Sequence, residues 1–230
     1  MNNLCSNTIF FGMVISLLGY GVGILLKQKL RSAFLNPLLI SIIMVIAVLK
    51  ISGVQYDTYL DGAKYLSYLL TPTTVCLAIP LYRQIKLLKS NLKAILIGVT
   101  AGVITSMESV FCLSKIFKFS HEQYVTLLPK SITTAIGMGI SEELGGIVTI
   151  TVAVIILTGI FGNIIAELLC RIFHIEHPIA KGLAIGTSSH AIGTTRAMEM
   201  GEIEGAMSSL AIVVAGLLTV VFISFFVRLI

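Results

Sequence analysis

The sequence predicts an all-α polytopic membrane protein. The chain of 230 residues is 56% hydrophobic and only 12% charged, and its mean hydropathy is +0.99. A soluble domain has about a quarter of its residues charged. The charged residues of this chain fall in clusters between long apolar runs, which is typical of a protein that crosses a membrane several times.

The apolar runs predict seven transmembrane helices, because each helix needs about 20 apolar residues to cross the hydrocarbon layer. The first run has no basic residue before it and is followed by further runs, so we expect a retained helix and not a cleaved signal peptide. We expect the shorter apolar piece at 129–141 to be re-entrant. The expected spans lie near 8–26, 36–51, 64–82, 93–116, 146–170, 180–198 and 206–228.

Basic residues predict the orientation of these spans. The loops at 27–35 and 83–93 are rich in Lys and Arg, and two spans separate them, so both face the cytoplasm. The N-terminus then lies outside and the C-terminus in the cytoplasm. If 129–141 crosses the membrane fully, everything after it inverts and the agreement worsens. No loop is long enough for a soluble domain, so we expect one membrane domain over 1–230.

A weak internal similarity favours two inverted repeats, over about 34–118 and 146–230. The TPTT that begins at Thr71 is followed by an AGVIT that ends at Thr105, and the TSSH of 187–190 is followed by an AGLLT that ends at Thr219. Inverted repeats around interrupted helices are a recurring plan of secondary transporters. Chance is the alternative, because small apolar alphabets produce such matches.

Three segments combine helix breakers with hydroxyl groups, and the first is LLTPTTVCLAIP at 69–80. Pro72 and Pro80 each remove an amide donor, so nearby carbonyls lose their helical partners. In lipid these carbonyls need other partners, which the hydroxyls of Thr73 and Thr74 can supply. The alternative is a kinked helix packed against its neighbours.

The second segment is LPKSITTAIGMGISEELGG at 128–146. Lys130 at its mouth can attract an anion, although a lysine that reaches to the membrane surface is the alternative. Glu142 is a candidate for a coupling proton or cation, or it caps an interfacial turn. The hydroxyls that line the segment and the glycine expected to interrupt its helix are Ser131, Thr133 and Gly137.

The third segment is GTSSHAIGTTRAMEMGEIEG at 186–205. If Gly193 ends one half-helix and Thr194 caps the next, free amides meet at the positive end of a helix dipole, which suits a small carboxylate. Ser189 and His190 line this break. A lone intramembrane histidine can be structural, but the surrounding hydroxyls and glycines favour function. Arg196 either reinforces the site or reaches the outer surface.

Other function classes lack support in the sequence. The net charge of +5 marks cytoplasmic loops and does not point to nucleic acid. The four cysteines are far apart, which favours buried hydrophobes over a metal or disulfide role. The HIEH at 174–177 has no evident third metal ligand. No G-x-S-x-G or H-E-x-x-H motif occurs, so we expect no enzymatic activity, no metal and no cofactor.

At these same segments the sequence resembles the LrgB/CidB family of bacterial membrane proteins. The matching stretches are LTPTTVCLAIPLYRQ (70–84), PKSITTAIGMGISEELGG (129–146) and GLAIGTSSHAIGTTRAMEMGEIEGAMSSLA (182–211). With the apolar frame between them, the likeness covers nearly the whole chain. The plastid glycolate/glycerate translocator of plants looks similar across its carboxy-terminal half, but it also has an LrgA-like domain, which this chain lacks.

The resemblance implies two functions for a protein of the bacterial cytoplasmic membrane. The first is transport of small monocarboxylates such as pyruvate, glycolate or glycerate, with a small LrgA- or CidA-like membrane partner. For a transporter we expect alternating access and, by analogy with other transporters, a homodimer. The alternative is an antiholin-like or holin-like modulator of murein hydrolase activity and cell lysis. By matching position it implicates Pro72, Thr73, Thr74, Lys130, Ser131, Thr133, Ser189, His190, Gly193, Thr194 and Arg196.

Overall fold

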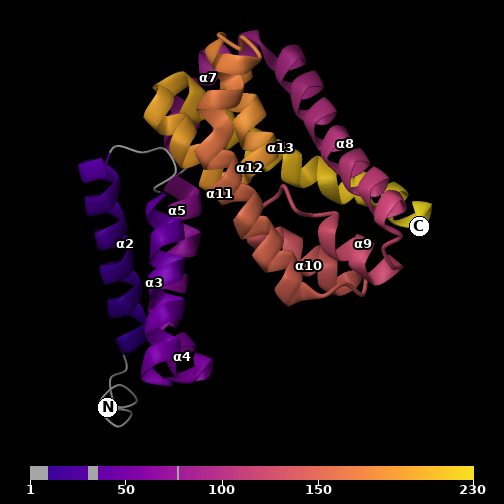
Figure 1. Ribbon diagram of the computed structural model, residues 1–230. Coiled ribbons are helices and arrows are strands. Elements are labelled where there is room, and N and C mark those ends of the chain that lie inside the picture. Colours follow the sequence, from indigo (N-terminus) through magenta and orange to yellow (C-terminus); the bar gives the residue numbers. More distant parts are fainter. Residues whose placement is uncertain (1–9, 31–35, 77) are drawn as a thin grey trace. The chain divides into compact units, whose positions relative to one another are not determined.

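The computed structural model describes residues 10–30, 36–76 and 78–230, and every regular element in these ranges is a helix (Figure 1). Within them, four helical stretches are long and apolar enough to cross a membrane. The prediction of an all-α polytopic membrane protein is confirmed. The four are α2 (Phe11–Leu30), α8 (Leu92–Phe117), α11 (Val148–Ile172) and Glu202–Leu229, which contains α13 (Glu202–Phe226).

The other three predicted spans differ from this pattern. The apolar helix α3 (Pro37–Ser52) has only 16 residues. The region 64–82 is divided among α4 (Tyr56–Ser67), α5 (Leu70–Cys76) and α6 (Ala78–Arg83), so it is not one continuous helix. Helix α12 (Pro178–Met200) is 23 residues long but too polar to meet the same criterion. In α12 the polar residues that the sequence singled out are the ones that lower the apolarity of the helix.

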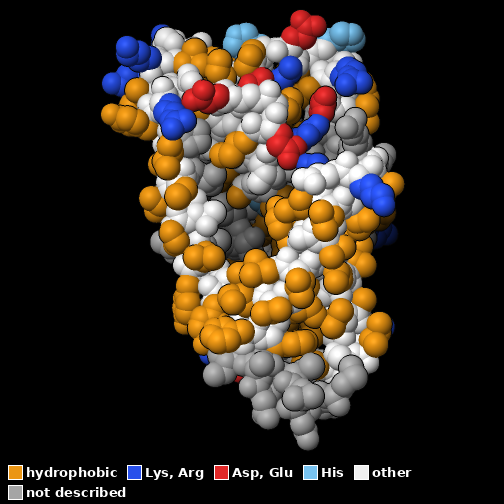
Figure 2. All heavy atoms as spheres, turned by 90° about the vertical axis from the view of Figure 1, so that its left-hand side faces the viewer, with side chains coloured by type: hydrophobic (Ala, Val, Ile, Leu, Met, Phe, Trp, Pro, Cys, Tyr) orange, Lys and Arg blue, Asp and Glu red, His pale blue; other side chains and the backbone are white. Residues whose placement is uncertain are grey.

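The chain forms two compact units, Met1–Cys76 and Leu77–Ile230, which we describe separately. Hydrophobic side chains are spread over much of the face drawn in Figure 2, and large hydrophobic residues are exposed in both units. A soluble protein rarely exposes so much continuous apolar surface. Such a surface is suited to contact with lipid. The single domain and the inverted repeats stay predictions.

In the first unit, α2 and α3 lie side by side (Figure 1). Asn36 caps α3, because its Oδ1 accepts hydrogen bonds from the backbone amides of Leu38 at 2.9 Å and Leu39 at 3.3 Å. Pro37 occupies the first turn, where its missing amide hydrogen matters least. Gly53, with φ of 66°, ends the helix in the left-handed conformation.

Small residues on one face of α2 allow this close packing. A Cβ on Gly23 would lie 2.6 Å from the carbonyl oxygen of Pro37, and one on Gly19 would lie 3.0 Å from Oγ of Ser41. Oγ of Ser41 donates to the carbonyl of Ser16 at 3.2 Å. Without a hydrophobic driving force between helices in lipid, such backbone approach and interhelical hydrogen bonding supply the association energy.

The second unit contains the main apolar core, formed by α8, α13, the start of α12 and α9 (His121–Leu127). The hydroxyl of Tyr124, which is fully buried, donates to the carbonyl of Phe226 at 2.9 Å and so fixes α9 against the end of α13. Short α7 (Ile85–Ser90) precedes α8. The buried residues that α8 contributes recur at helical spacing, namely Ile95, Val99, Val103, Met107 and Val110.

The segment 129–141 does not form one spanning helix. It comprises a turn and most of α10 (Thr134–Glu143), whose ten residues extend only about 15 Å at roughly 1.5 Å per residue, half the hydrocarbon thickness. Gly137 does not interrupt this helix, contrary to the prediction. A side chain there would meet Ile155 of α11, so this glycine permits close packing of α10 against α11.

Substitutions in α2 test the packing of the first unit. Gly23→Ala places a methyl group against backbone atoms of Pro37 that cannot rotate away, so we expect a loss of about 1–3 kcal/mol in unfolding free energy. Gly21→Ala is the matched control, because its Cβ would meet nothing within 4 Å. Thermal unfolding of the detergent-solubilised protein measures the stability of both variants. A Gly23→Ala protein at least as stable as Gly21→Ala would contradict the close contact.

Candidate functional site

Helix α12 is interrupted at His190, within the third segment that the sequence singled out. His190 has φ of 41° and ψ of −141°, and it is the one residue inside α12 with non-helical torsions. A non-glycine residue in such a conformation costs roughly 1–3 kcal/mol, so surrounding contacts must hold it there. The interruption was predicted at Gly193, three residues later. Gly193 is helical, and its missing side chain leaves room for Ser189 and Ile185.

The imidazole of His190 is 3% exposed and is held by α11. Its Nε2 lies 2.9 Å from the backbone carbonyl oxygen of Ile155, and because a carbonyl can only accept, Nε2 carries the hydrogen. A Cβ on Gly159 would lie 2.7 Å from Cε1 of the imidazole. Gly162, one turn along α11, likewise leaves room for the side chain of Ser189. Two glycines of α11 thus accommodate consecutive side chains at the interruption.

Thr194 links the interruption to α13. Its Oγ1 donates to the carbonyl of His190 at 2.9 Å, and since a hydroxyl has one hydrogen, it accepts from Oγ of Ser208 at 2.7 Å. Both hydroxyls are fully buried. The prediction that Thr194 caps a new half-helix is therefore replaced by a role in joining α12 to α13. The bond from Thr194 satisfies the carbonyl of the distorted residue itself, as lipid surroundings require.

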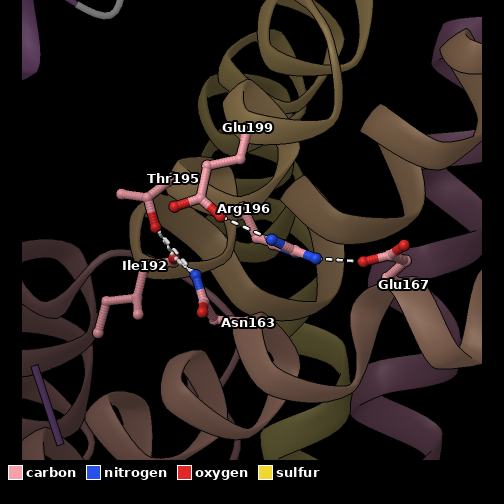
Figure 3. A network of polar contacts seen from close by, with 6 residues as sticks. All are labelled: Asn163, Glu167, Ile192, Thr195, Arg196 and Glu199. Atoms are coloured by element: carbon pink, nitrogen blue, oxygen red, sulfur yellow. Dashed lines mark hydrogen bonds and ion pairs between the residues drawn. The ribbon is translucent and has the colours of Figure 1, made fainter. Parts of the chain in front are cut away.

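A polar network holds the part of α12 after His190 against α11 (Figure 3). Nδ2 of Asn163 donates to the carbonyl of Ile192 and to Oγ1 of Thr195, both at 2.9 Å. The guanidinium of Arg196 forms ion pairs with Glu167 of α11 and, at 2.7 Å, with Glu199 of α12. Its charge is neutralised within the protein. Arg196 therefore pairs with two carboxylates of the same chain, and this pairing agrees with either of its two predicted roles.

Two of the predicted segments meet in one cavity of 660 Å³. Lys130 from the second segment and Ser188 and Ser189 from the third contribute to its wall. Nζ of Lys130 donates to Oγ of Ser131 at 3.2 Å, and Ser131 in turn shares a hydrogen bond of 2.9 Å with Ser106 of α8. The rest of the wall comes from α11, two residues just after it and the first half of α12, and is mainly apolar.

The other predicted residues lie elsewhere. Thr133 precedes α10, where its carbonyl accepts from the amide of Gly137 at 2.9 Å, and Glu142 is exposed near the end of that helix. Pro72 and Thr73 are exposed on α5 of the first unit. Both prolines lie within short helices. The side chains of Thr74 and Pro80 lie outside the described part of the structure.

A second cavity, of 610 Å³, was not foreseen from the sequence. Charged residues near the ends of α11 and α12, among them Arg196 and Lys181, line it together with the buried Glu204 of α13. Two residues of the polar network, Asn163 and Glu167, were also not predicted. They are four residues apart and so share one face of a helix, which is the sequence signal that could have identified them. Among the described residues, no three His, Cys, Asp or Glu side chains gather as a metal ion would need.

These features define a class of protein, an all-helical integral membrane protein with an interrupted helix beside buried hydroxyls and a cavity. The model of the LrgB-like family matches residues 16–229, and the chain belongs to this family. Proteins named "Antiholin-like protein LrgB" from Bacillus cereus (strain B4264) and Bacillus anthracis (strain CDC 684 / NRRL 3495) are each 40% identical over 220 residues. The match covers 95% of this chain and 96% of each relative. No solved structure matched the chain.

A substitution in α11 tests the position of the imidazole. In Gly159→Ala the added methyl group would lie 2.7 Å from Cε1 and 2.9 Å from Nε2 of His190, so we expect the ring to move and its bond to Ile155 to break. Diethyl pyrocarbonate modification, located by mass spectrometry, should be slow at His190 in the wild type and faster in the variant. Gly139→Ala, whose Cβ meets nothing within 4 Å, is the control. Equally fast modification in all three proteins would show that the ring is not buried.

Proposed function

We propose that this protein is an antiholin-like modulator of murein hydrolase activity and cell lysis, located in the bacterial cytoplasmic membrane. The observation that carries the proposal is 40% identity, over 95% of the chain, to proteins named antiholin-like LrgB. A match of this extent includes every helix from α3 to α13 and most of α2. The helices that cross the membrane in this chain support a site of action at the membrane itself.

Orientation and partner belong to the same proposal. The basic loops at 27–35 and 83–93 favour an external N-terminus and a cytoplasmic C-terminus. A small LrgA-like membrane protein is the proposed partner, and a homodimer is the proposed assembly. Apolar side chains exposed along α2 and α13 supply lipid-facing surface on which other membrane helices can pack.

A second candidate function, transport of small monocarboxylates, is favoured by a separate observation. Helix α12 is interrupted at His190, and the cavity beside its first half brings Lys130 together with the hydroxyls of Ser188 and Ser189. Interrupted helices near a polar site are typical of secondary transporters. The ammonium of Lys130 is the group in this cavity that attracts a carboxylate. In this proposal, lysis control follows from carboxylate flux, so the two functions are compatible.

The lysis function is tested in a bacterium that lacks its own LrgB-like gene. Expression of the wild-type protein should slow detergent-induced autolysis relative to an empty vector. Gly186→Leu should lose the effect, because even a Cβ there would lie 2.7 Å from Cβ of Ala211 and force α12 away from α13. Gly139→Leu, at an exposed and open position of α10, should retain it. Equal autolysis with and without the wild-type protein, at confirmed membrane expression, would refute the proposal.

The transport function is tested with purified protein in liposomes, with and without the LrgA-like partner. We expect saturable uptake of labelled pyruvate, glycolate or glycerate, and no release of trapped sucrose. Lys130→Gln should reduce uptake at least tenfold because it removes the attracting charge, whereas Lys93→Gln, at an exposed position outside both cavities, should not. Release of sucrose together with the acids would indicate a pore and contradict a carrier.

A further inference from the structure

The cavity of 660 Å³ combines one cationic group with a long apolar wall. Val154, Leu157, Phe161, Ile165 and Leu169 of α11 contribute to this wall at spacings of three or four residues, so they form one continuous stripe. With Phe173 just beyond the helix, the stripe extends about 28 Å at roughly 1.5 Å per residue. Ligand sites are typically mainly apolar, with a few polar groups that fix orientation.

The ammonium of Lys130 has no carboxylate partner among the described residues. Its hydrogen bond goes to the neutral hydroxyl of Ser131, and the ion pairs found in the described chain involve other residues. An unpaired charge beside apolar groups is costly, and in membrane proteins such groups usually face a polar partner or a pathway. A bound monovalent anion would supply the missing partner.

The ammonium of Lys130 lies toward the end of the stripe that begins at Val154. A Cβ on Gly137 would touch Ile155 and would lie 3.5 Å from the carbonyl oxygen of Pro129, so the residue before Lys130 lies near Ile155, next to Val154 at the start of the stripe. Phe173 marks the opposite end. Phe161 and Phe173 are 64% and 68% exposed, so the wall is open along its length and can admit a chain from the side.

We propose that this cavity binds an amphiphilic monocarboxylate, with its carboxylate at Lys130 and its apolar chain along the α11 stripe toward Phe173. A small hydrophilic acid would pair with the ammonium but leave most of the wall uncovered. Each additional methylene that leaves water for such a wall contributes about 0.8 kcal/mol. The inference goes beyond the proposed function, because equilibrium binding of this ligand requires neither lysis control nor transport.

Photolabelling of the purified protein in nanodiscs tests the proposal. The probe is dodecanoate with a diazirine at the end of its chain, and labelled peptides are identified by mass spectrometry. We expect label in α11 at 161–173, and little near 154–158. Unlabelled dodecanoate should compete, whereas dodecanol, which lacks the charge, and acetate, which lacks the chain, should compete at least tenfold less well.

Variants separate a specific site from general partition into lipid. Lys130→Met should lower labelling at least fivefold, Lys130→Arg should retain most of it, and Lys93→Met should match the wild type. Ala184→Phe fills the cavity from an exposed position of α12, so it should block labelling with Lys130 intact and covers the case in which Lys130→Met does not fold.

Two outcomes would overturn the inference. Equal competition by dodecanol, or unchanged labelling in Lys130→Met, would show that the charge plays no part. Full competition by acetate would show that the cavity selects small acids, which refutes an amphiphilic ligand while leaving the transport candidate intact.

Discussion

The need to satisfy backbone hydrogen-bonding groups within lipid constrains the central part of this protein. An interruption inside a membrane helix leaves carbonyls and amides that water cannot reach, and each such group costs several kcal/mol when it lacks a partner. At His190 the chain meets this constraint with side chains of α12 and α13 and a backbone carbonyl of α11. The backbone carbonyl of His190 accepts a hydrogen bond from the hydroxyl of Thr194, which accepts one from the hydroxyl of Ser208 on α13. The imidazole of His190 donates to the backbone carbonyl of Ile155 on α11. Contacts with α11 and α13 therefore hold the interruption in place.

Glycine allows these helices to approach closely enough to form such bonds. Gly159 and Gly162 leave space on α11 for His190 and Ser189, and a Cβ on Gly182 of α12 would lie 2.5 Å from the carbonyl of Glu204 on α13. In the first unit, Gly23 of α2 has the same relation to Pro37 of α3. Glycines in a membrane segment thus have two explanations: they loosen the helix, or they allow neighbouring side chains and helices to pack closely. In this protein Gly137 and Gly193 belong to the second.

The sequence was sufficient for the fold class and for the approximate position of most helices, because long apolar runs in a bilayer have few alternatives. It also located the third segment, where hydroxyls, glycines and a histidine coincide. It placed the interruption at Gly193 because glycine tolerates unusual torsions. The structure has it at His190, where contacts with Gly159 and Ile155 of another helix offset the strain. Such contacts join residues about 30 positions apart. The pairing of Asn163 and Glu167 with the end of α12 was missed for the same reason.

The network around Arg196 has a mechanical consequence. Asn163 and Glu167 bond to the part of α12 after His190, whereas the part before it approaches α13 closely at Gly182 and Gly186. The two halves of α12 are therefore held differently, the second by polar bonds to α11 and the first by close backbone approach to α13. A displacement of one half relative to the other would change the torsions of His190, the one residue inside α12 whose backbone is not helical.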